Sequence, residues 1–284
     1  MPLSETFNVT LVRPDAFRPA EALRPTAFHL ACALRRLGER VHLGENEFLH
    51  DATNIIVGAH LLDAPVAGTL PAGTIVFNTE ALDQGAHADA LRPFVARFHV
   101  WDYDRRNIER LRALGNRTVD VIAPGYVPEM TTVVHREVKD IDVLFYGQLS
   151  AHRRDILAAI EHRGFRVVWL HDVYGTARDP WLARARLVLN LHYRPGAPLE
   201  LGRVVHLLAN RCAVVAESDA PADIDPALAR GLAAAPAASI PPLVGELLRD
   251  ARRRTALAEC GFAQITRMDY CVSVRHALGR RPVA

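Results

Sequence analysis

The chain has 284 residues, which is long for one ordinary domain and suits two domains of about 100–200 residues each. Half of the residues are hydrophobic, so the chain can bury a sizeable core. The 34 basic and 32 acidic residues leave a formal net charge of only +2. This balance does not indicate a dedicated nucleic-acid-binding protein, in which basic residues gather on one face.

Four widely spaced cysteines give no CxxC pair, so the sequence predicts neither a zinc site of ordinary spacing nor a disulfide framework. They are Cys32, Cys212, Cys260 and Cys271. The N-terminus has no basic segment followed by a long apolar stretch, and no run approaches 18 apolar residues. We therefore expect a cytoplasmic protein with reduced thiols, no secretion signal and no transmembrane segment.

Short apolar strands alternate with amphipathic helices along most of the chain, and this alternation predicts parallel sheets covered on both faces. The unbroken apolar run at Asn54–Val57 suits a strand that is buried on both sides. In the first half we expect strands at Phe7–Val12, Val41–Leu43, Asn54–Val57, Thr74–Asn78, Phe98–Trp101 and Val119–Ala123, and helices at Ala22–Leu37 and Asp104–Leu114, with Asp104 as an N-cap.

The stretch 128–140 is polar and β-branched without a helical period, and we interpret it as an interdomain linker. The alternation then starts again. We expect strands at Asp142–Tyr146, Arg166–Leu170, Leu187–Leu191 and Ala213–Ala216, helices at Arg153–Arg163, Trp181–Ala185, Leu199–Asn210, Pro242–Leu257 and Glu259–Ala277, and a loop at Ala233–Pro242.

The fold class is therefore α/β, with two Rossmann-like lobes: an N-terminal lobe at 1–127 and a second lobe at 141–258. In sheets of this kind ligands bind beyond the carboxyl ends of the strands. The first lobe has Val12-Arg13-Pro14-Asp15 where a dinucleotide-binding protein would carry G-x-G-x-x-G, so we expect no conventional dinucleotide site there.

In the second lobe Gly147 and Gln148 follow a strand and precede a helix that contains Arg153. A glycine lets the backbone approach a ligand, and a helix N-terminus offers free N–H groups to an anion. An ordinary strand-to-helix turn would look the same. The next strand ends in His171-Asp172-Val173-Tyr174, which is either a polar turn or a loop with a tyrosine able to stack on a base.

His192 and Tyr193 end a further strand, and Glu200 and Arg203 begin the helix after it. Glu200 and Arg203 lie one helical turn apart, so they share a face. A carboxylate there can accept from sugar hydroxyls and an arginine can hold phosphate oxygens, although a simple ion pair fits the same spacing. His192 taken alone is more typical of a structural histidine.

Four residues of the first lobe follow strands and can act as a general base: Asp15, His60, Glu80 and Asp102. Each of them also fits a structural role. No Ser/His/Asp triad can be read from the spacing.

The second half resembles the C-terminal domain of GT-B-fold glycosyltransferases, in the bacterial group loosely called family-1-like. The matching segments are Asp142-Val-Leu-Phe-Tyr-Gly147, Asn190-Leu-His-Tyr193, Glu200-x-x-Arg203 and Leu207–Val215 with Glu217. In the first half, Trp101-Asp-Tyr-x-x-x-Asn107-Ile and Pro124-Gly-Tyr126 look like the partner lobe. The resemblance implies two lobes with a cleft between them, and a C-terminal segment, 259–284, that packs back on the first lobe.

The resemblance also implies a function: transfer of a sugar from a nucleoside-diphosphate donor such as a UDP-sugar, bound by the second lobe, to an acceptor bound by the first. It implies no metal or other cofactor, because helix dipoles and basic groups neutralise the leaving diphosphate. The acceptor can be a small molecule, a glycan or a protein. On this reading the donor site comprises Gly147, Gln148, Arg153, His171, Asp172, Tyr174, His192, Tyr193, Glu200 and Arg203, and Glu80 or His60 faces the acceptor.

The sequence departs from the family where retaining members carry a second glutamate before a Gly-x-Pro turn. His206 stands at the glutamate, Arg211 at the glycine and Ala213 at the proline. Whether the anomeric configuration is retained is therefore left open. A nucleotide-sugar epimerase and a catalytically silent binding or scaffold subunit are the alternatives.

Overall fold

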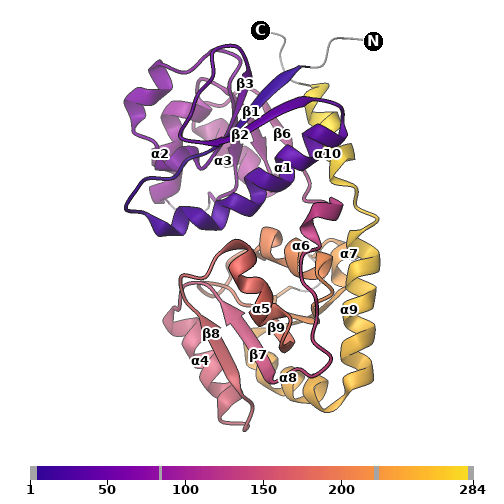
Figure 1. The fold of residues 1–284 in the computed structure, drawn as a ribbon. Coiled ribbons are helices and arrows are strands. Elements are labelled where there is room, and N and C mark those ends of the chain that lie inside the picture. The colour runs from indigo at the N-terminus through magenta and orange to yellow at the C-terminus, as the bar shows by residue number, and fades with distance from the viewer. Residues whose placement is uncertain (1–4, 83–84, 221–223, 281–284) are drawn as a thin grey trace. The chain divides into compact units, whose positions relative to one another are not determined.

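The computed structural model describes residues 5–82, 85–220 and 224–280 of the chain. The chain forms two compact units (Figure 1). Unit 1 holds the residues up to Val127 together with those from Tyr270 onward, and unit 2 runs from Pro128 to Asp269. Each unit is built on one parallel sheet, so the predicted α/β architecture with two Rossmann-like lobes is confirmed.

The sheet of unit 1 has the order β2-β1-β3-β4-β5-β6, and all of its pairings are parallel. Its central strands are buried because both faces are covered, as their unbroken apolar runs predict. The strands are β1 (Thr6–Leu11), β2 (Arg40–Glu45), β3 (Thr53–Val57), β4 (Ile75–Asn78), β5 (His99–Asp102) and β6 (Val119–Val121).

The expected helix at Ala22–Leu37 begins as a 3₁₀ turn, η1 (Arg18–Leu23), and continues as α1 (Arg24–Arg36), with a proline in its first turn. Asp104 is confirmed as an N-cap, since its side chain accepts a hydrogen bond from the backbone N–H of Arg106. The other helices here are η2 (Ala59–Leu61), η3 (Ala64–Gly68), α2 (Gly85–Val95), η4 (Arg105–Asn107) and α3 (Ile108–Ala113).

The sheet of unit 2 has the order β11-β10-β9-β7-β8, again with parallel pairings only. Its edge strand β11 occupies a stretch that we expected to be a loop, because a run of alanines is a weak strand signal by itself. Pairing with β10 decides the outcome. The strands are β7 (Ile141–Tyr146), β8 (Val167–Leu170), β9 (Ala185–Asn190), β10 (Val214–Glu217) and β11 (Leu232–Ala235).

The single helix expected over Pro242–Leu257 is two helices, because Asp250 has an extended backbone and caps the second one. Its carboxylate accepts from the N–H of Arg253 at 2.9 Å. The helices of unit 2 are η5 (Pro128–Met130), α4 (Ala151–Glu161), η6 (Gly175–Arg178), α5 (Asp179–Leu182), α6 (Leu201–Ala209), α7 (Pro226–Ala229), η8 (Ala237–Ser239), α8 (Ile240–Arg249) and α9 (Ala251–Ile265).

The segment 128–140, interpreted as a linker, is packed on unit 2 and held there by Asn210. The buried Asn210 amide accepts from the N–H groups of Thr132 and Val133 at 2.8 and 2.9 Å, and it donates to the carbonyl of Met130 at 2.8 Å. His135 adds a contact of 2.6 Å to the Asn210 carbonyl. Because one side chain binds three consecutive peptides, this polar stretch is ordered without a helical or strand period.

The chain enters unit 1 for the second time at Tyr270, where α10 (Tyr270–Leu278) begins. The helix expected over Glu259–Ala277 is therefore divided: its first part is the end of α9, in unit 2, and its second part is α10, which packs on α1. Val274 and Ala277 supply the buried face of α10. No helix among the described residues is both long and apolar enough to cross a membrane.

Candidate functional site

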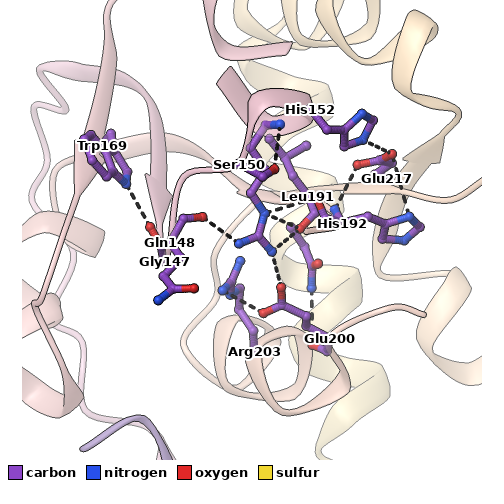
Figure 2. Close-up of polar contacts among 12 residues, drawn as sticks. Gly147, Gln148, Ser150, His152, Trp169, Leu191, His192, Glu200, Arg203 and Glu217 are labelled. Carbon is purple, nitrogen blue, oxygen red and sulfur yellow. Dashed lines mark hydrogen bonds and ion pairs between the residues drawn. The ribbon is translucent and has the colours of Figure 1, made fainter. Parts of the chain in front are cut away.

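The carboxyl edge of the unit 2 sheet gathers polar side chains from separate strands and helices (Figure 2). Gly147 follows β7, Leu191 and His192 follow β9, and Glu200 and Arg203 lie at the start of α6. Because β7 and β9 are neighbours in a parallel sheet, their carboxyl ends meet at the same edge. The structure thus brings together five of the residues proposed from sequence: Gly147, Arg153, His192, Glu200 and Arg203.

Gly147 has a backbone conformation that side chains disfavour, with φ of +120°. A Cβ atom at this position would lie 2.9 Å from Nη2 of Arg203 and 3.7 Å from Nη1 of Arg153. The absence of a side chain therefore lets the two guanidinium groups approach the backbone. Gln148 beside it is exposed, and its carbonyl accepts from Nη1 of Arg153 at 2.8 Å.

Arg153 is only 3% exposed and is committed to protein partners. Its Nε and Nη2 donate to the carbonyls of Leu191 and His192, and Nη2 also pairs with the carboxylate of Glu200. Its guanidinium lies over the ring of the exposed Tyr193, 5.4 Å from the centroid. Arg153 thus ties the loop after β7 to the loop after β9 and to α6, and few of its N–H groups remain for a ligand.

Glu200 lies between two arginines, since its second oxygen is 2.7 Å from Nη2 of Arg203. The Nη1 atom of Arg203 is buried and has no hydrogen-bond partner. Such a group is costly to bury unless an acceptor reaches it. Arg203 can therefore donate a further hydrogen bond to a ligand at this edge.

Arg178, at the end of η6, joins the cluster although spacing gave no reason to select it. Its guanidinium carbon lies 4.3 Å from the ring centroid of Tyr146 and 5.6 Å from that of Tyr174. The guanidinium of Arg203 lies 4.8 Å from the same Tyr146 ring, and the buried Tyr146 hydroxyl has no partner. Arg178 donates to the Val173 carbonyl at 2.7 Å rather than to a carboxylate, so it adds an uncompensated positive charge.

Strand β8 and the loop after it carry the remaining aromatic and polar candidates. The hydroxyl of Tyr174 donates to Asp172 at 3.0 Å, and Asp172 lies 3.5 Å from Nδ1 of His171. Trp169, which sequence reasoning missed, is 41% exposed and donates from Nε1 to the Gly147 carbonyl at 2.9 Å. Its ring is 5.5 Å from that of His171, so two rings line this side of the edge.

A second polar group surrounds the fully buried carboxylate of Glu217 at the end of β10 (Figure 2). One oxygen accepts from the backbone N–H of His192 at 2.8 Å, and the other is 2.7 Å from Nε2 of His152 on α4. Burial lowers the pKa of the His192 imidazole, and Glu217 acts against that shift. Glu217 therefore positions the His192 loop, whose carbonyls in turn hold Arg153.

His206, which stands where we expected the second glutamate, is a half-buried histidine on α6. Burial lowers its pKa to about 4, and the nearby Arg178 acts in the same direction. It lies 3.4 Å from the amide of Asn210, the residue that holds segment 128–140. No carboxylate replaces the family's glutamate at this position, and Glu200 is the carboxylate closest to the arginines.

In unit 1, His60 and Glu80 lie together at the carboxyl ends of β3 and β4. Nε2 of His60 is 3.9 Å from a carboxylate oxygen of Glu80, and the His60 ring meets that of His87 edge-on at 5.0 Å. Burial lowers the pKa of His60 to about 4, and His87 adds to the shift. The side chain of Glu80 is 27% exposed against 8% for His60, so Glu80 is the more accessible base.

The other two candidate bases of unit 1 lie elsewhere. Asp15 is exposed in the loop after β1. Asp102 is fully buried at the end of β5 and accepts from the N–H of Asp104 at 2.7 Å and from the amide of Asn78 at 2.8 Å. Its burial excludes direct contact with an acceptor. Among the described residues no group of histidine, cysteine, aspartate and glutamate side chains has the geometry of a metal site.

No protein-family model matches the chain. A curated relative, an uncharacterized protein of Acanthamoeba polyphaga mimivirus, is 23% identical over 153 residues, or 51% of this chain. The match spans about one fifth of the relative's length, 20%. It identifies no activity.

Solved structures match almost the whole chain. The glycosyltransferase AviGT4 of avilamycin A biosynthesis is 14% identical with a TM-score of 0.63, covering 97% of this chain and 96% of its own. HepE of Anabaena, solved with UDP and glucose, is 12% identical with a TM-score of 0.62, covering 97% and 98%. The T4 phage enzyme BGT, solved with its substrate UDP-glucose, is 8% identical with a TM-score of 0.62, covering 98% and 100%. The chain therefore has the two-unit GT-B fold of glycosyltransferases.

Proposed function

We propose that the protein is a glycosyltransferase that moves a sugar from a nucleoside-diphosphate donor, bound on unit 2, to an acceptor bound on unit 1. The observation that carries the proposal is the uncompensated positive charge at the carboxyl edge of the unit 2 sheet. Three guanidinium groups gather there, those of Arg153, Arg178 and Arg203, and within the described part of the chain Glu200 is the one carboxylate that forms an ion pair with them. A diphosphate brings the negative charge that this group needs.

Within this proposal Arg203 and Arg178 hold the diphosphate, and Gly147 gives it access to the backbone. Arg203 carries a buried donor without a partner, and Arg178 carries no paired carboxylate, whereas Arg153 is occupied by protein carbonyls. Arg153 thus holds the loops of the site in place. From sequence we expected it to contact the nucleotide sugar directly, and we now propose Arg178 for that contact. Charge-assisted bonds of this kind stabilise the departing diphosphate in the transition state.

The loop after β8 is the proposed base-binding side of the donor site. Trp169 and His171 present ring faces beside Gly147, and Tyr174 is held by Asp172 next to Arg178. Stacking on such rings suits the flat base of a nucleotide. The exposed Tyr193 and Gln148 border the same edge.

Glu80 is the proposed general base toward the acceptor hydroxyl. It is the more accessible of the Glu80–His60 pair, and its carboxylate suits proton removal at neutral pH. A base of this kind contributes roughly 10²–10⁴-fold to the rate of an inverting transfer. His60, neutral at pH 7 because burial lowers its pKa to about 4, is suited to hold the acceptor by a hydrogen bond.

We further propose that the transfer needs no metal ion, since the arginines supply the charge that a cation would otherwise supply. The four cysteines are free thiols, which supports a reducing, cytoplasmic setting like that of bacterial enzymes of this type.

A nucleotide-binding experiment tests the donor site. UDP, GDP and dTDP are titrated separately while the thermal unfolding midpoint is recorded, and we expect saturable stabilisation by at least one of them, because a ligand that binds only the folded state raises its stability. Arg203→Gln and Arg178→Gln should each weaken that nucleotide about tenfold or more, since a hydrogen bond from a charged group contributes about 1.5–3 kcal/mol.

Arg186→Gln is the matched control. Arg186 pairs with Asp142 at 2.7 Å near the start of β9, at the amino edge of the same sheet, so its loss should leave nucleotide affinity unchanged. Absence of stabilisation by all three nucleotides would contradict a donor site and favour a non-catalytic subunit. Release of free nucleoside diphosphate from the matching nucleotide sugar separates transfer or hydrolysis from epimerisation.

A further inference from the structure

A buried polar cluster at the ends of β4 and β5 has no place in the donor site of unit 2. Asp102 is 0% exposed, Asn78 2% and Asn107 5%. The amide nitrogens of Asn78 and Asn107 donate to the Asp102 carboxylate at 2.8 and 3.1 Å. Burying a polar side chain costs free energy unless it is hydrogen-bonded. The hydrogen-bond partners of these three side chains therefore show which part of the chain they fix in place.

Both asparagines hold the backbone of one residue, Glu80. The Nδ2 atoms of Asn78 and Asn107 each donate to the Glu80 carbonyl at 2.9 Å. The Oδ1 atom of Asn78 accepts from the Glu80 N–H at 3.2 Å, and that of Asn107 accepts from the Leu82 N–H at 3.0 Å. The peptide groups on both sides of the Glu80 side chain are therefore fixed by residues that lie on β4 and η4.

The carboxylate of Asp102 and the carbonyl of Glu80 together determine which way both amides face. Each NH₂ group has two hydrogens, and in each asparagine one serves Asp102 while the other serves the Glu80 carbonyl. Above its pKa the Asp102 carboxylate accepts and cannot donate, and the Glu80 carbonyl only accepts, so rotating either amide by 180° would place an oxygen against both. With the amides fixed in this way, their oxygens must face the N–H groups of Glu80 and Leu82.

We propose that Asp102 is a positioning residue that acts through Asn78 and Asn107 to fix the backbone of Glu80, and thereby the point at which the Glu80 carboxylate meets the acceptor. The proposal rests on the proposed role of Glu80 as general base. It also explains the segment Trp101-Asp-Tyr-x-x-x-Asn107, which the donor site leaves without a function. Burial raises the pKa of Asp102 to about 7, and the donors from Asn78, Asp104 and Asn107 act against that rise.

Asp102→Asn tests the proposal because it keeps the shape and replaces an acceptor by a group with two donors. One Asp102 oxygen accepts from the Asp104 N–H and the other from the Asn78 amide, so an amide nitrogen in either place faces an N–H donor and the cluster loses at least one bond. We expect the exchange of the Glu80 and Leu82 backbone amide hydrogens, measured residue by residue by NMR, to become at least tenfold faster. Asp120→Asn is the control: Asp120 is a largely buried carboxylate on β6 that pairs with His99 at 3.0 Å. It should leave both amides unchanged.

Turnover then separates positioning from simple destabilisation. With UDP-glucose as the probe and UDP release as the readout, Asp102→Asn should lower kcat about tenfold and leave the KM for the donor within twofold. In a Glu80→Gln background the same substitution should lower kcat no further, because Asp102 acts only through Glu80. A merely structural role would lower turnover in both backgrounds.

Unchanged exchange at Glu80 and Leu82 in Asp102→Asn would overturn the inference, and this readout needs no substrate. An equal loss of kcat with and without the Glu80 carboxylate would overturn it as well. Full turnover in Glu80→Gln would instead contradict the proposed function of Glu80. The three outcomes can therefore be told apart.

Discussion

Residue 147 shows how the absence of a side chain shapes the proposed donor site. Its φ of +120° lies in a region that suits glycine, and the Arg203 guanidinium occupies the space a methyl group would take. Gly147 thus allows the turn after β7, and it also lets the Arg203 guanidinium lie close to the backbone. A residue with a Cβ atom would strain the turn and displace the end of the Arg203 side chain.

Gly147→Ala should therefore reduce both stability and nucleotide affinity. Backbone strain of this kind costs about 1–3 kcal/mol, and displacement of Arg203 removes a charged donor from the diphosphate. We expect lower free energy of unfolding in urea, and nucleotide affinity reduced tenfold or more by calorimetry.

Gly164→Ala separates the two effects. Gly164 also has a positive φ, +85°, but a Cβ there would meet nothing within 4 Å. This variant should lose stability and keep its nucleotide affinity. Equal affinities in Gly147→Ala and Gly164→Ala would show that Arg203 does not serve the ligand.

Individual site residues were predictable where they directly follow a strand. Gly147 and His192 were predicted to share one edge because parallel strands end there, and the Glu200–Arg203 pair was predicted from its place at a helix start; the structure brings these residues together. Arg178 was not found, since it reaches the cluster through its stacking on Tyr146, and no spacing in the sequence records that contact. The hydrogen bonds from Arg153 to backbone carbonyls could not be predicted either, because every residue has a carbonyl and the sequence does not show which of them lie near Arg153.

At the scale of elements, one side chain replaces regular secondary structure along the segment 128–140. Asn210 ends α6 and binds the peptides of Met130, Thr132 and Val133. The segment is thereby attached to the same helix whose first turn carries Glu200 and Arg203. The Thr131 hydroxyl, the His135 ring and the Arg136 N–H add bonds to the carbonyls of Ala209, Asn210 and Ala183.

Asn210→Ala should lower the free energy of unfolding of unit 2 by about 2–4 kcal/mol, because several backbone groups lose their partner at once. Exchange of the Thr132 and Val133 amide hydrogens should become faster. Asn210→Asp keeps the acceptor for those two N–H groups and loses only the donors, so its effect should be smaller. Equal stability of Asn210→Ala and the wild type in urea would contradict this assignment.

Elements were predictable where they carry their own signal. The apolar runs of β1, β3, β4 and β7 located these strands to within about two residues. The alanine-rich β11 was taken for a loop, because its strand character comes from pairing with β10 rather than from its own side chains. The helix break at Asp250 was not predicted, because the amphipathic pattern continues through it. Only the extended backbone of Asp250 shows that this aspartate caps a second helix.

Among the described residues, His60, His206 and Asp102 are titratable groups whose effects on the stability of the whole molecule oppose one another. Burial lowers the pKa of His60 and His206 to about 4, and it raises that of Asp102 to about 7. A histidine with a lowered pKa loses stability as the pH falls from 6.5 toward 4, because the unfolded chain takes up the proton first. A carboxyl with a raised pKa loses stability as the pH rises from about 4 toward 7.

His60 and Asp102 therefore oppose each other within unit 1, whereas His206 acts alone among these three in unit 2. Acidification from pH 7 to pH 5 should remove on the order of 2 kcal/mol of unit 2 stability through His206. His206→Gln should lack this part of the loss when urea unfolding is compared at the two pH values, and it should keep the part that comes from His135 and His192, whose pKa values burial also lowers. The same pH dependence in the variant would show that His206 titrates normally in the folded protein.

The return of the chain to unit 1 at Tyr270 also determines the order in which the halves can be finished during synthesis. The six strands of unit 1 leave the ribosome first, but α10, which covers α1 with the buried Val274 and Ala277, is made after every residue of unit 2. Unit 2 is one uninterrupted stretch and can close as soon as it has emerged. The half that is translated first is thus completed last, and until then the part of α1 that α10 covers stays exposed.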